Sequence, residues 1–561
     1  MKKLLLACAA SVLLGAAPVP KAPFPAFLDR FLEEDFKVEP TYAVYQGRHD
    51  HDGELPDWSD AGLKSKAAFY RAAIAQAQGF TDNRLTRDQR FERDYLIAVA
   101  RGRLFWLEDA DQPHRNPSYY ISMLDPNVYV ARPYADAATR MRAVTAFARH
   151  IPAAAAQVRA NLRMPMPLTF INFGKAGFQG LADYYAKDVP AAFAGVKDAK
   201  LQADLAAATT AAATALHGLA EWLEQNRGAA TQDFALGPER FQRMLYATEM
   251  VDTPVAELEA VGRADLKRNQ DALNEACAAY APGASITDCT AKANAHKGEG
   301  GPVATARRQI PELRAFVLAK QLVTIPGTEQ ALANEAPPFM RQNTAYIDPP
   351  GPYEHGLPSV YYISPPDPAW TPEVQRASTP GETNLLFVTV HEVMPGHFLQ
   401  FLHANRSPSF FSRVFVGNAF AEGWAHYAEE MMWEAGLRKG DPEAHIGQLA
   451  NALQRDCRYL SAIGLHTQGM TVEQSRKMFV EQCYQAEGTA RQQAARGTYD
   501  PAYLVYTMGK LMIRRLRTDW TATHGGRAGW KAFHDELLDH GGPPIPLVRG
   551  LMMDTKSTAA F

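Results

Sequence analysis

The stretch LLFVTVHEVMPGHFLQF, residues 385–401, combines a near-continuous apolar run with a His-Glu pair and a second histidine. The run is too long for a typical strand, so it predicts a buried helix. Burying His391, Glu392 and His397 in such a helix is costly unless a partner satisfies their polar groups. Because a metal ion would satisfy them, the stretch predicts a metal site within a helical core.

The two histidines are six residues apart, a spacing that differs from the His-Glu-x-x-His motif of many zinc hydrolases. A spacing of four puts both imidazoles on one helical face, whereas a spacing of six rotates His397 about 120° away. Pro395 removes a backbone donor and clashes with the carbonyl of His391, and Gly396 tolerates unusual dihedral angles. We therefore expect the helix to bend or unwind at Pro395-Gly396, which would bring His397 back toward the metal.

A third ligand is expected in the helical segment NAFAEGWAHYAEE, residues 418–430. Glu422 lies there among apolar residues, where a carboxylate needs a partner. Two imidazoles and this carboxylate would hold Zn²⁺ and leave one position open for water. Glu392 is then free to take the proton of that water and deliver it to the leaving amine. The alternative is a pair of structural histidines with Glu422 bound to an arginine.

For four further side chains in or near this segment, the sequence predicts less specific roles. His426 follows Glu422 by one helical turn and is expected to be an outer partner of the ligands. His403 is expected at the surface. Glu429 and Glu430 are expected to be solvated, with the alternative that one of them orients a ligand.

The C-terminal segment supplies candidates for stabilising a transition state. Tyr499, Tyr503, Tyr506 and Lys510 are spaced 4, 3 and 4 residues apart, so they would share one face of a helix. A tyrosine hydroxyl there could donate to the oxyanion of a tetrahedral intermediate, although such aromatic stripes also pack as core. His466 is another candidate donor, with a structural role as its alternative.

Basic side chains in the same segment are candidates for binding a substrate. Lys510, Arg514 or Arg515 would hold a substrate carboxylate, which favours carboxypeptidase or dipeptidase action. The alternative is that all three are solvated.

Helical patterns dominate the rest of the chain. Capping boxes are expected at Thr86-x-x-Gln89 and at Thr471-x-x-Gln474. The best strand candidates are Tyr346-Ile347 and residues 359–363, SVYYI, and the latter is expected to offer an edge for pairing with a substrate strand. No Ser/Gly linker or internal repeat divides the chain. Residues 18–561 therefore predict a single large helical region, with its catalytic motifs in 385–515.

The N-terminus, MKKLLLACAASVLLGAA, has the pattern of a secretory signal peptide over residues 1–17. Lipoprotein anchoring at Cys8 is less favoured, because only about four apolar residues precede this cysteine, too few for the apolar region of a signal. A buried N-terminal helix is a further alternative. No later segment reaches the apolar length that a membrane span needs, so no stable membrane insertion is expected and the location is periplasmic or secreted.

Export permits disulfide bonds, and four cysteines remain after removal of Cys8. Four cysteines allow three pairings, and their order in the chain suggests Cys277–Cys289 and Cys457–Cys483. Four buried thiols are the alternative. None of these cysteines has the Cys-x-x-Cys spacing of a redox or zinc site.

Composition bounds the class of protein. The 561 residues are 47% hydrophobic and 21% charged, as in ordinary globular proteins, and this length usually divides into lobes or domains. The net charge of −3, without runs of like charge, gives no reason to expect a nucleic-acid partner. Neither a Gly-x-Ser-x-Gly elbow nor a Gly-rich phosphate loop is present in the sequence.

The motifs together resemble the bacterial family called "domain of unknown function 885", over nearly all of the mature chain. The His-Glu-x-x-Pro-Gly-His motif and Glu-Gly-Trp-Ala carry the resemblance, and supporting segments lie near both ends. The chain departs from the family pattern at Ala462 and at Asp500-Pro501-Ala502, which bears on His466 and Tyr503 rather than on the metal site. The matching residues are His391-Glu392-x-x-Pro395-Gly396-His397, Glu422-Gly423-Trp424-Ala425-x-Tyr427, Pro40-Thr41-Tyr42-Ala43, Gly47, Asp52, Gly464-Leu465-His466, Thr471-x-x-Gln474 and Tyr506-x-x-Gly509-Lys510.

This resemblance implies His391, His397 and Glu422 as zinc ligands and Glu392 as the base. It also implies a relation to helical zinc peptidases such as thimet oligopeptidase and angiotensin-converting enzyme. Those proteins have a deep channel between two lobes. We therefore expect a mostly α, two-lobed metallopeptidase-like fold with a deep central channel and a small β element near the active site.

The expected function is a secreted, zinc-dependent peptidase that hydrolyses short peptides with metal-activated water. Its catalytic residues would be Glu392, Tyr506, His466 and Tyr503. One alternative is a zinc amidohydrolase that acts on non-peptide amides. Another is a non-catalytic periplasmic binding protein on the same scaffold, which is disfavoured because Glu392 and all three ligands are retained.

Overall fold

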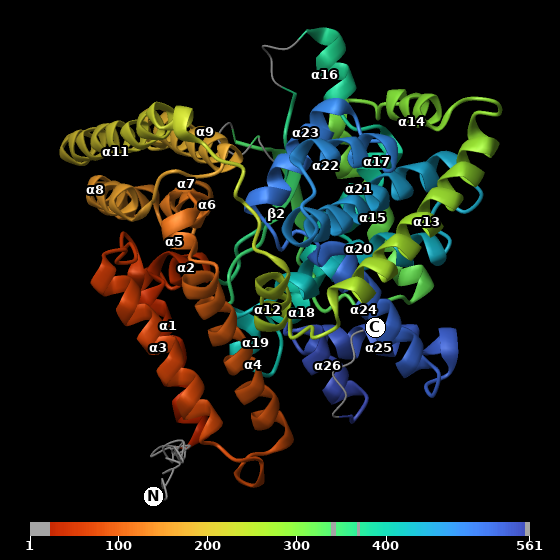
Figure 1. Ribbon diagram of the computed structural model, residues 1–561, viewed down its shortest axis with the longest axis horizontal. Helices are drawn as coiled ribbons and strands as arrows, with labels where there is room; N and C mark the ends of the chain where they lie inside the picture. The colour runs from red at the N-terminus through yellow and green to blue at the C-terminus, as the bar shows by residue number, and fades with distance from the viewer. Residues whose placement is uncertain (1–22, 338–340, 342–343, 367–370, 556–560) are drawn as a thin grey trace, which may run out of the picture.

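The computed structural model describes residues 23–337, 341, 344–366, 371–555 and 561. The expected signal peptide and Cys8 lie outside these described residues. About 70% of the chain is helical, and a three-stranded sheet accompanies the helices (Figure 1). The predicted mostly α class with a small β element is therefore confirmed.

Helices of the N-terminal half lie on one side of Figure 1, drawn in red to yellow. Two groups can be distinguished, because α3 packs on α4, while α8 and α9 pack on α11. The helices are α1 (Phe24–Val38), α2 (Pro40–Tyr45), α3 (Asp60–Gln78), α4 (Arg87–Leu104), α5 (Gln112–Arg115), α6 (Ser118–Ile121), α7 (Asn127–Ala131), α8 (Ala137–Asn161), α9 (Leu168–Asp183), α10 (Val189–Ala192) and α11 (Ala199–Gln225).

The helices that follow residue 225 form the rest of the molecule, drawn in yellow-green to blue. Here α13 packs on α21, α20 on α24, and α17 on both α20 and α21. The helices are α12 (Pro238–Glu249), α13 (Val255–Tyr280), α14 (Ile286–Ala295), α15 (Gly301–Lys320), α16 (Pro372–Ser378), α17 (Glu382–Glu392), α18 (His397–Ala404), α19 (Phe410–Val414), α20 (Asn418–Glu434), α21 (Pro442–Thr467), α22 (Val472–Glu481), α23 (Glu487–Tyr499), α24 (Val505–Thr521), α25 (Trp530–Asp539) and α26 (Ile545–Met552).

Both predicted capping boxes are confirmed. The Thr86 side chain accepts from the backbone N–H of Gln89 and begins α4, while the Gln89 side chain accepts from the Thr86 N–H. Thr471 and Gln474 make the same reciprocal contacts at the start of α22. Each pair satisfies two backbone donors that a helix N-terminus leaves free.

The sheet contains both predicted strands and one that the sequence did not reveal. Its order is β1 (Ala331–Glu335), β3 (Ser359–Ile363), β2 (Ala345–Asp348). β3 pairs parallel with β1 and antiparallel with β2, with Tyr346 opposite Tyr362. The expectation that SVYYI is an edge strand is wrong, because β3 lies in the centre. β2 is an edge strand of this sheet.

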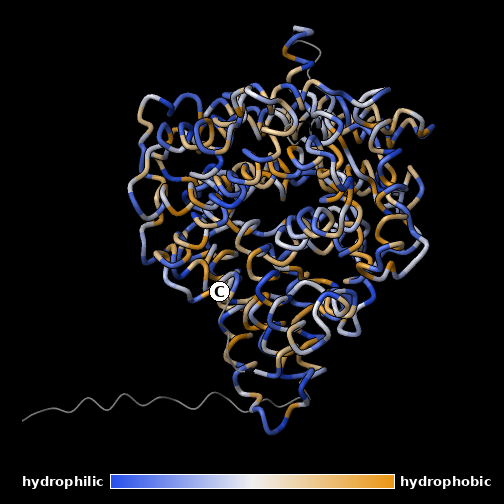
Figure 2. The backbone as a smooth tube through the Cα atoms, turned by 90° about the vertical axis from the view of Figure 1, so that its right-hand side faces the viewer, coloured by the Kyte–Doolittle hydropathy of each residue, from blue (hydrophilic) through white to orange (hydrophobic). Residues whose placement is uncertain are grey.

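Three hydrophobic clusters hold the helices together. The largest unites α12 to α15, α17, α18 and α20 to α26 with the sheet, another joins α8, α9 and α11, and the third joins α1, α3 and α4 to α19. Figure 2 shows hydrophobic and hydrophilic residues mixed along most helices, as expected for helices that bury one face. The stretch that begins at Leu385 is among the most deeply buried parts of the largest cluster.

The predicted helix break is confirmed. α17 ends at Glu392 and α18 begins at His397, and the Met394–Pro395 peptide between them is cis. Gly396 approaches the preceding turn so closely that a Cβ atom there would lie 1.8 Å from the carbonyl oxygen of His391. The indole of Trp424, on α20, donates a hydrogen bond of 2.9 Å to the Pro395 carbonyl. The break is therefore held directly against the helix that carries Glu422.

A close helix contact fixes the position of α20 itself. Gly423 of α20 faces Gly509 of α24, and a Cβ atom on Gly423 would lie 2.5 Å from the Gly509 Cα. Side chains at either position would separate the two helices. Glu422 and Tyr506 therefore stand on helices that meet backbone to backbone.

Segment Glu382–Ala404 is long and apolar enough to cross a membrane by length and composition alone, so the expectation that no later segment reaches this length is wrong. However, 89% of its most apolar part is buried inside the protein. It also contains the break between α17 and α18. In this structure the segment lies inside the largest hydrophobic cluster.

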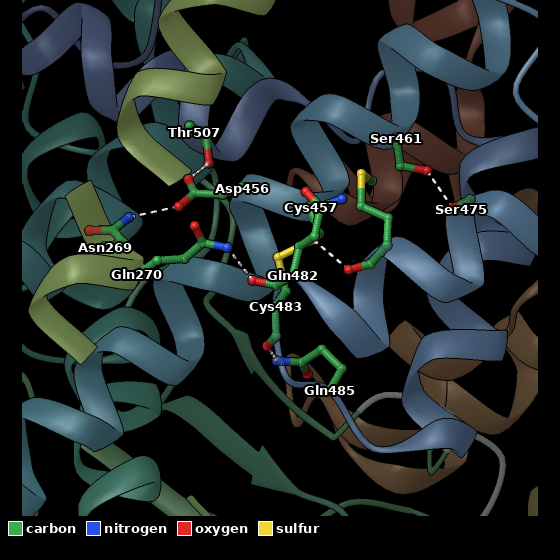
Figure 3. Close-up of a disulfide and its surroundings, with 11 residues drawn as sticks. Asn269, Gln270, Asp456, Cys457, Ser461, Ser475, Gln482, Cys483, Gln485 and Thr507 are labelled. Atoms are coloured by element: carbon green, nitrogen blue, oxygen red, sulfur yellow. Dashed lines mark hydrogen bonds between the residues drawn. A yellow bond between two sulfur atoms is a disulfide. The ribbon is translucent and has the colours of Figure 1, made fainter. Parts of the chain in front are cut away.

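Both predicted disulfide pairings are confirmed. Cys277 of α13 bonds to Cys289 of α14, and Cys457 of α21 bonds to Cys483, which follows α22. Figure 3 shows the second bond beside Asp456, which accepts hydrogen bonds from Asn269 and Thr507. This bond ties the connection after α22 to the middle of α21.

Candidate metal centre

His391, His397 and Glu422 converge at the break between α17 and α18. The Nε2 atoms of His391 and His397 each lie 3.4 Å from Oε2 of Glu422. One nitrogen or oxygen from each residue lies within 4.8 Å of the others. Both histidines are buried, and the Glu422 side chain is 27% exposed. The break thus corrects the spacing of six residues in the way that the sequence suggested.

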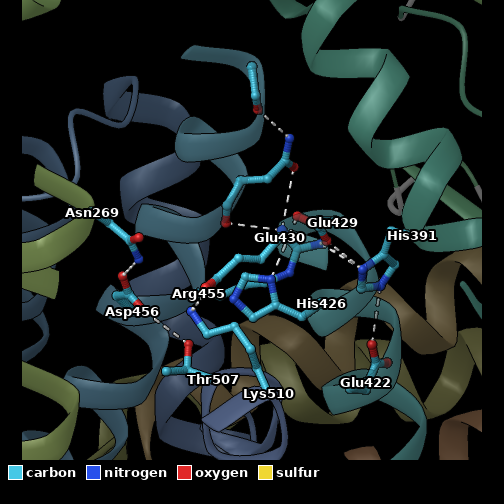
Figure 4. A network of polar contacts seen from close by, with 12 residues as sticks. Asn269, His391, Glu422, His426, Glu429, Glu430, Arg455, Asp456, Thr507 and Lys510 are labelled. Carbon is cyan, nitrogen blue, oxygen red and sulfur yellow. Dashed lines mark hydrogen bonds and ion pairs between the residues drawn. The ribbon is translucent and has the colours of Figure 1, made fainter. Parts of the chain in front are cut away.

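Glu429 holds the opposite side of the His391 ring (Figure 4). His391 Nδ1 donates to Glu429 Oε1 at 2.7 Å, because a carboxylate only accepts. This bond leaves Nε2 unprotonated in the neutral imidazole and directs it toward Glu422 and His397. Arg455 lies 3.2 Å from the same carboxylate oxygen. Metal-binding histidines commonly have such a carboxylate on the second nitrogen.

The expectation that Glu429 is solvated is therefore wrong, since its side chain is fully buried. The alternative, that a glutamate of this pair orients a ligand, agrees with its contact to His391. Its position could have been found in the sequence, because Glu429 follows Glu422 by seven residues, close to two helical turns.

The electrostatics of the triad favour a cation. Burial raises the pKa of Glu422, but His397 and His391 lower it by more, to well below its usual range. Burial and Arg455 lower the pKa of His391, but its contacts with Glu422 and Glu429 raise it by more, so that the pKa rises to about 9. The carboxylate is ionised and attracts positive charge, which a proton or a metal ion can supply.

His426 lies one step further from the triad than Glu429. Its ring is fully buried, with Nδ1 3.6 Å from Oε2 of Glu429. Burial lowers the pKa of His426 to about 3, so the imidazole is neutral. It packs behind Glu429 rather than against a candidate ligand (Figure 4).

All three candidate ligands line a cavity of about 1590 Å³. Its wall comes from both halves of the chain, including Asp125 and α9 on one side and α17, α20, α21 and α24 on the other. Glu392 lines it next to His391, and its carboxylate forms no hydrogen bond or ion pair with the described residues. A free carboxylate beside the triad is suitably placed for a general base.

Tyr506, one of the predicted tyrosines, lies beside the triad. It lines the cavity, and its ring stacks on His391 with centroids 6.3 Å apart. Burial and Glu422 raise its pKa while nearby arginines lower it, with a net increase, so the phenol keeps its proton. The hydroxyl is therefore a hydrogen-bond donor beside the triad.

The single helical face expected for the tyrosines is wrong. α23 ends at Tyr499 and α24 begins at Val505, so a turn interrupts the pattern. Tyr503 lies in that turn, is fully buried, and does not line the cavity. Its hydroxyl lies close to Gly497, where it would touch a Cβ atom. Tyr503 is thus placed as a core residue.

His466 is also placed away from the triad. Its Nε2 donates to the Gly497 carbonyl at 2.7 Å, and its Nδ1 accepts from the Leu236 N–H at 3.2 Å. Both nitrogens are used in joining α21 to other segments, and the ring does not line the large cavity. The structural alternative fits His466, and the donor role does not.

Lys510 is buried rather than placed in the cavity, which contradicts both its expected roles. It pairs with Asp265 and lies 3.7 Å from Glu430. Arg514 also contacts Glu430, at 3.3 Å, while Arg515 pairs with Asp519 at 2.9 Å. None of the three basic side chains lines the cavity.

Glu430 and His403 are further corrections. Glu430 is buried, not solvated, because it neutralises this basic group. His403 is also buried, where Nε2 donates to the Thr324 carbonyl at 2.8 Å. Asp539 lies 3.3 Å from its Nδ1.

The fold and the site define a large helical protein with a His-His-Glu cluster in a cavity. The sequence profile of the family described as "Bacterial protein of unknown function (DUF885)" matches residues 40–552, so the chain belongs to this family.

Two solved structures share this fold. One, a putative lipoprotein of unknown function from Shewanella oneidensis, aligns with a TM-score of 0.78 and 24% identity over 95% of this chain and 100% of that one. The other, a putative lipoprotein from Colwellia psychrerythraea, aligns with a TM-score of 0.80 and 17% identity over 95% and 98%. At these identities the likeness concerns the fold alone. No curated protein matches the chain.

Proposed function

We propose that the chain is an exported zinc-dependent peptidase whose metal is held by His391, His397 and Glu422. The convergence of two imidazole nitrogens and one carboxylate oxygen within 4.8 Å carries this proposal. The donor set fits zinc, which takes nitrogen and oxygen ligands and keeps an open position in catalytic sites. Glu422 Oε2 is buried without a hydrogen-bond partner among the described residues, as expected of an atom whose partner is a cation.

A bound zinc ion would polarise the substrate carbonyl and make a water molecule acidic enough to attack at neutral pH. Glu392 takes the proton of the attacking water and passes it to the leaving amine. Tyr506 donates a hydrogen bond to the carbonyl oxygen as negative charge develops there. Glu429 keeps the His391 ring in the orientation that presents Nε2.

Two features support a peptide as the substrate. The cavity of about 1590 Å³ exceeds the ~300–1,000 Å³ that small-molecule pockets usually have. β2, an edge strand, contributes Ala345, Tyr346 and Ile347 to its wall. An extended substrate would add to this strand by backbone hydrogen bonds. The proposal includes a two-lobed arrangement with a deep channel, related to the helical zinc peptidases.

Export is part of the proposal and rests on the N-terminal sequence. Cleavage near Ala17 would release the protein, whereas lipid attachment at Cys8 would anchor it. The fold neighbours are putative lipoproteins, which favours an envelope location. The mass of the mature N-terminal peptide distinguishes the two forms.

The test compares variants of the base and of two ligands. Glu392→Gln should keep zinc while turnover falls by at least ~10²-fold, the usual scale of general-base catalysis. His391→Ala and Glu422→Ala should lose both zinc and turnover, since each removes a metal bond. Cleavage of a mixed peptide library is compared with hydrolysis of simple amides.

The outcomes separate the alternatives. Full peptide cleavage by zinc-containing Glu392→Gln would exclude this mechanism. Loss of zinc from Glu392→Gln, as complete as from His391→Ala, would make Glu392 a ligand. Hydrolysis of simple amides without peptide cleavage would indicate an amidohydrolase, and peptide binding without any hydrolysis would indicate a binding protein.

A further inference from the structure

Three arginines line the same cavity as the candidate metal ligands: Arg455, Arg458 and Arg496. Two of them have acidic partners, because Arg455 contacts Glu429 at 3.2 Å and Arg496 contacts Asp500 at 2.9 Å. Arg458 has no acidic side chain within ion-pair distance among the described residues. Its Nε donates to Gln493 Oε1 at 2.7 Å. Its two terminal nitrogens form no hydrogen bond with the described residues.

Charge around Arg458 is poorly compensated. Burial, and then the positive charge of Arg496, lower the pKa of Arg458 to about 10, so the guanidinium stays charged at neutral pH but is disfavoured there. Arg455 acts in the same direction, whereas Tyr506 and Glu422 raise the pKa by less. The Arg458 side chain is partly exposed in the cavity. An anion bound to its terminal nitrogens would offset the repulsion from Arg496 and Arg455.

Tyr506 connects this guanidinium to the candidate metal centre. The Cζ atom of Arg458 lies 4.9 Å from the centroid of the Tyr506 ring. That centroid lies 6.3 Å from the centroid of His391. The sum of these two distances is therefore the largest possible separation between the Arg458 Cζ atom and the centroid of the His391 ring. An extended peptide covers it with about three residues at roughly 3.3–3.6 Å each.

We propose that Arg458 binds the C-terminal carboxylate of the peptide whose scissile bond lies at His391 and Glu422. The two terminal nitrogens of a guanidinium match the two oxygens of a carboxylate. For a fragment bound in an extended conformation, this distance corresponds to one to three residues. Water supplies hydroxyl to the new carboxyl group and hydrogen to the new amine, so the reaction balances as simple hydrolysis.

This proposal rests on the proposed peptidase function and gives it a substrate class. It also replaces the expectation that Lys510, Arg514 or Arg515 holds the substrate carboxylate. Asp265, Glu430 and Asp519 already neutralise those side chains outside the cavity.

The test uses binding rather than turnover as its main measurement. Zinc-loaded Glu392→Gln protein is immobilised, and N-acetylated random tetrapeptides are offered as free acids or as C-terminal amides. Captured peptides are identified by mass spectrometry. Retention of the free acids should exceed that of the amides by about ten-fold or more, the scale of hydrogen bonds to a charged group.

A second variant assigns this preference to one residue. Adding Arg458→Gln should abolish the preference, whereas adding Arg491→Gln should retain it. Arg491 is a suitable control because it lies outside the cavity, is 72% exposed and pairs with Glu487. Wild-type protein should release fragments of one to three residues from the free acids.

Each contrary result overturns the subsite. These results are equal capture of acids and amides, a preference that survives Arg458→Gln, no capture of either form, or enrichment of amides with Asp or Glu side chains to the level of the acids. Zinc-dependent cleavage without acid preference would overturn the subsite and leave the peptidase. Acid preference without any cleavage by the wild type would leave the subsite and overturn the peptidase.

Discussion

Replacing Glu429 with glutamine is expected to weaken zinc binding, although Glu429 is not a candidate ligand. Its carboxylate accepts the Nδ1–H of His391 at 2.7 Å, which fixes the tautomer and orientation of the ring. A glutamine amide is neutral and can turn a donor toward the same nitrogen. Loss of such an outer carboxylate typically costs 10–100-fold in metal affinity, about 1.4–2.7 kcal/mol.

The same change also lowers the stability of the metal-free protein. Glu429 is fully buried, and its partner Arg455 is 10% exposed, so the substitution leaves a buried guanidinium without its counter-charge. Breaking a buried ion pair in this way costs about 3–5 kcal/mol. Glu430→Gln is the matched control. It removes a neighbouring buried carboxylate that pairs with Lys510 and Arg514, and that carboxylate makes no contact with a candidate ligand.

Zinc affinity is measured by competition with a chromogenic chelator, and stability by denaturant unfolding of the metal-free proteins. Both variants should lose stability, but only Glu429→Gln should lose zinc affinity. Equal zinc affinity in wild type and Glu429→Gln would refute the orienting role. Equal losses of affinity in the two variants would show that the effect comes from general destabilisation.

Two further substitutions test the backbone and the electrostatics. Gly396→Ala should abolish zinc binding, because its Cβ atom would collide with the His391 carbonyl. Gly488→Ala, which has open space around it, should keep zinc binding. Metal analysis of the two purified proteins tests both expectations. Burial raises the pKa of Glu249 to about 8, so the folded state binds a proton that the unfolded state has lost, and stability falls as pH rises from about 4.5 to 8. Glu249→Gln should reduce this fall in the free energy of unfolding by up to about 4 kcal/mol, whereas Glu239→Gln, at an exposed position, should leave the fall unchanged. Denaturant unfolding at pH 5 and pH 8 measures both effects. An unchanged pH dependence in Glu249→Gln would contradict the argument.

Local patterns were enough to predict the parts of the fold that depend on neighbouring residues. Thr86 and Thr471 are followed by glutamine at the third position, and this spacing alone determines a capping box. Pro395-Gly396 likewise predicted the end of α17, because proline and glycine act on the adjacent turn. The convergence of the triad followed from that break.

Long-range partners explain what the sequence could not show. Lys510 pairs with Asp265, which lies 245 residues earlier, and no local pattern marks either as a partner of the other. His466 is held by Gly497 and Leu236 in the same way. The central place of β3 cannot be predicted from the sequence, because β1, residues 331–335 with the sequence ALANE, lacks the β-branched and aromatic residues that indicate strands.

Metal content of the purified wild-type protein, measured together with its peptidase activity, tests the central claim most directly. The account predicts about one zinc ion per chain, loss of peptide cleavage on treatment with a chelator, and recovery on adding Zn²⁺. A protein that contains no metal and cleaves peptides at the full rate would contradict it.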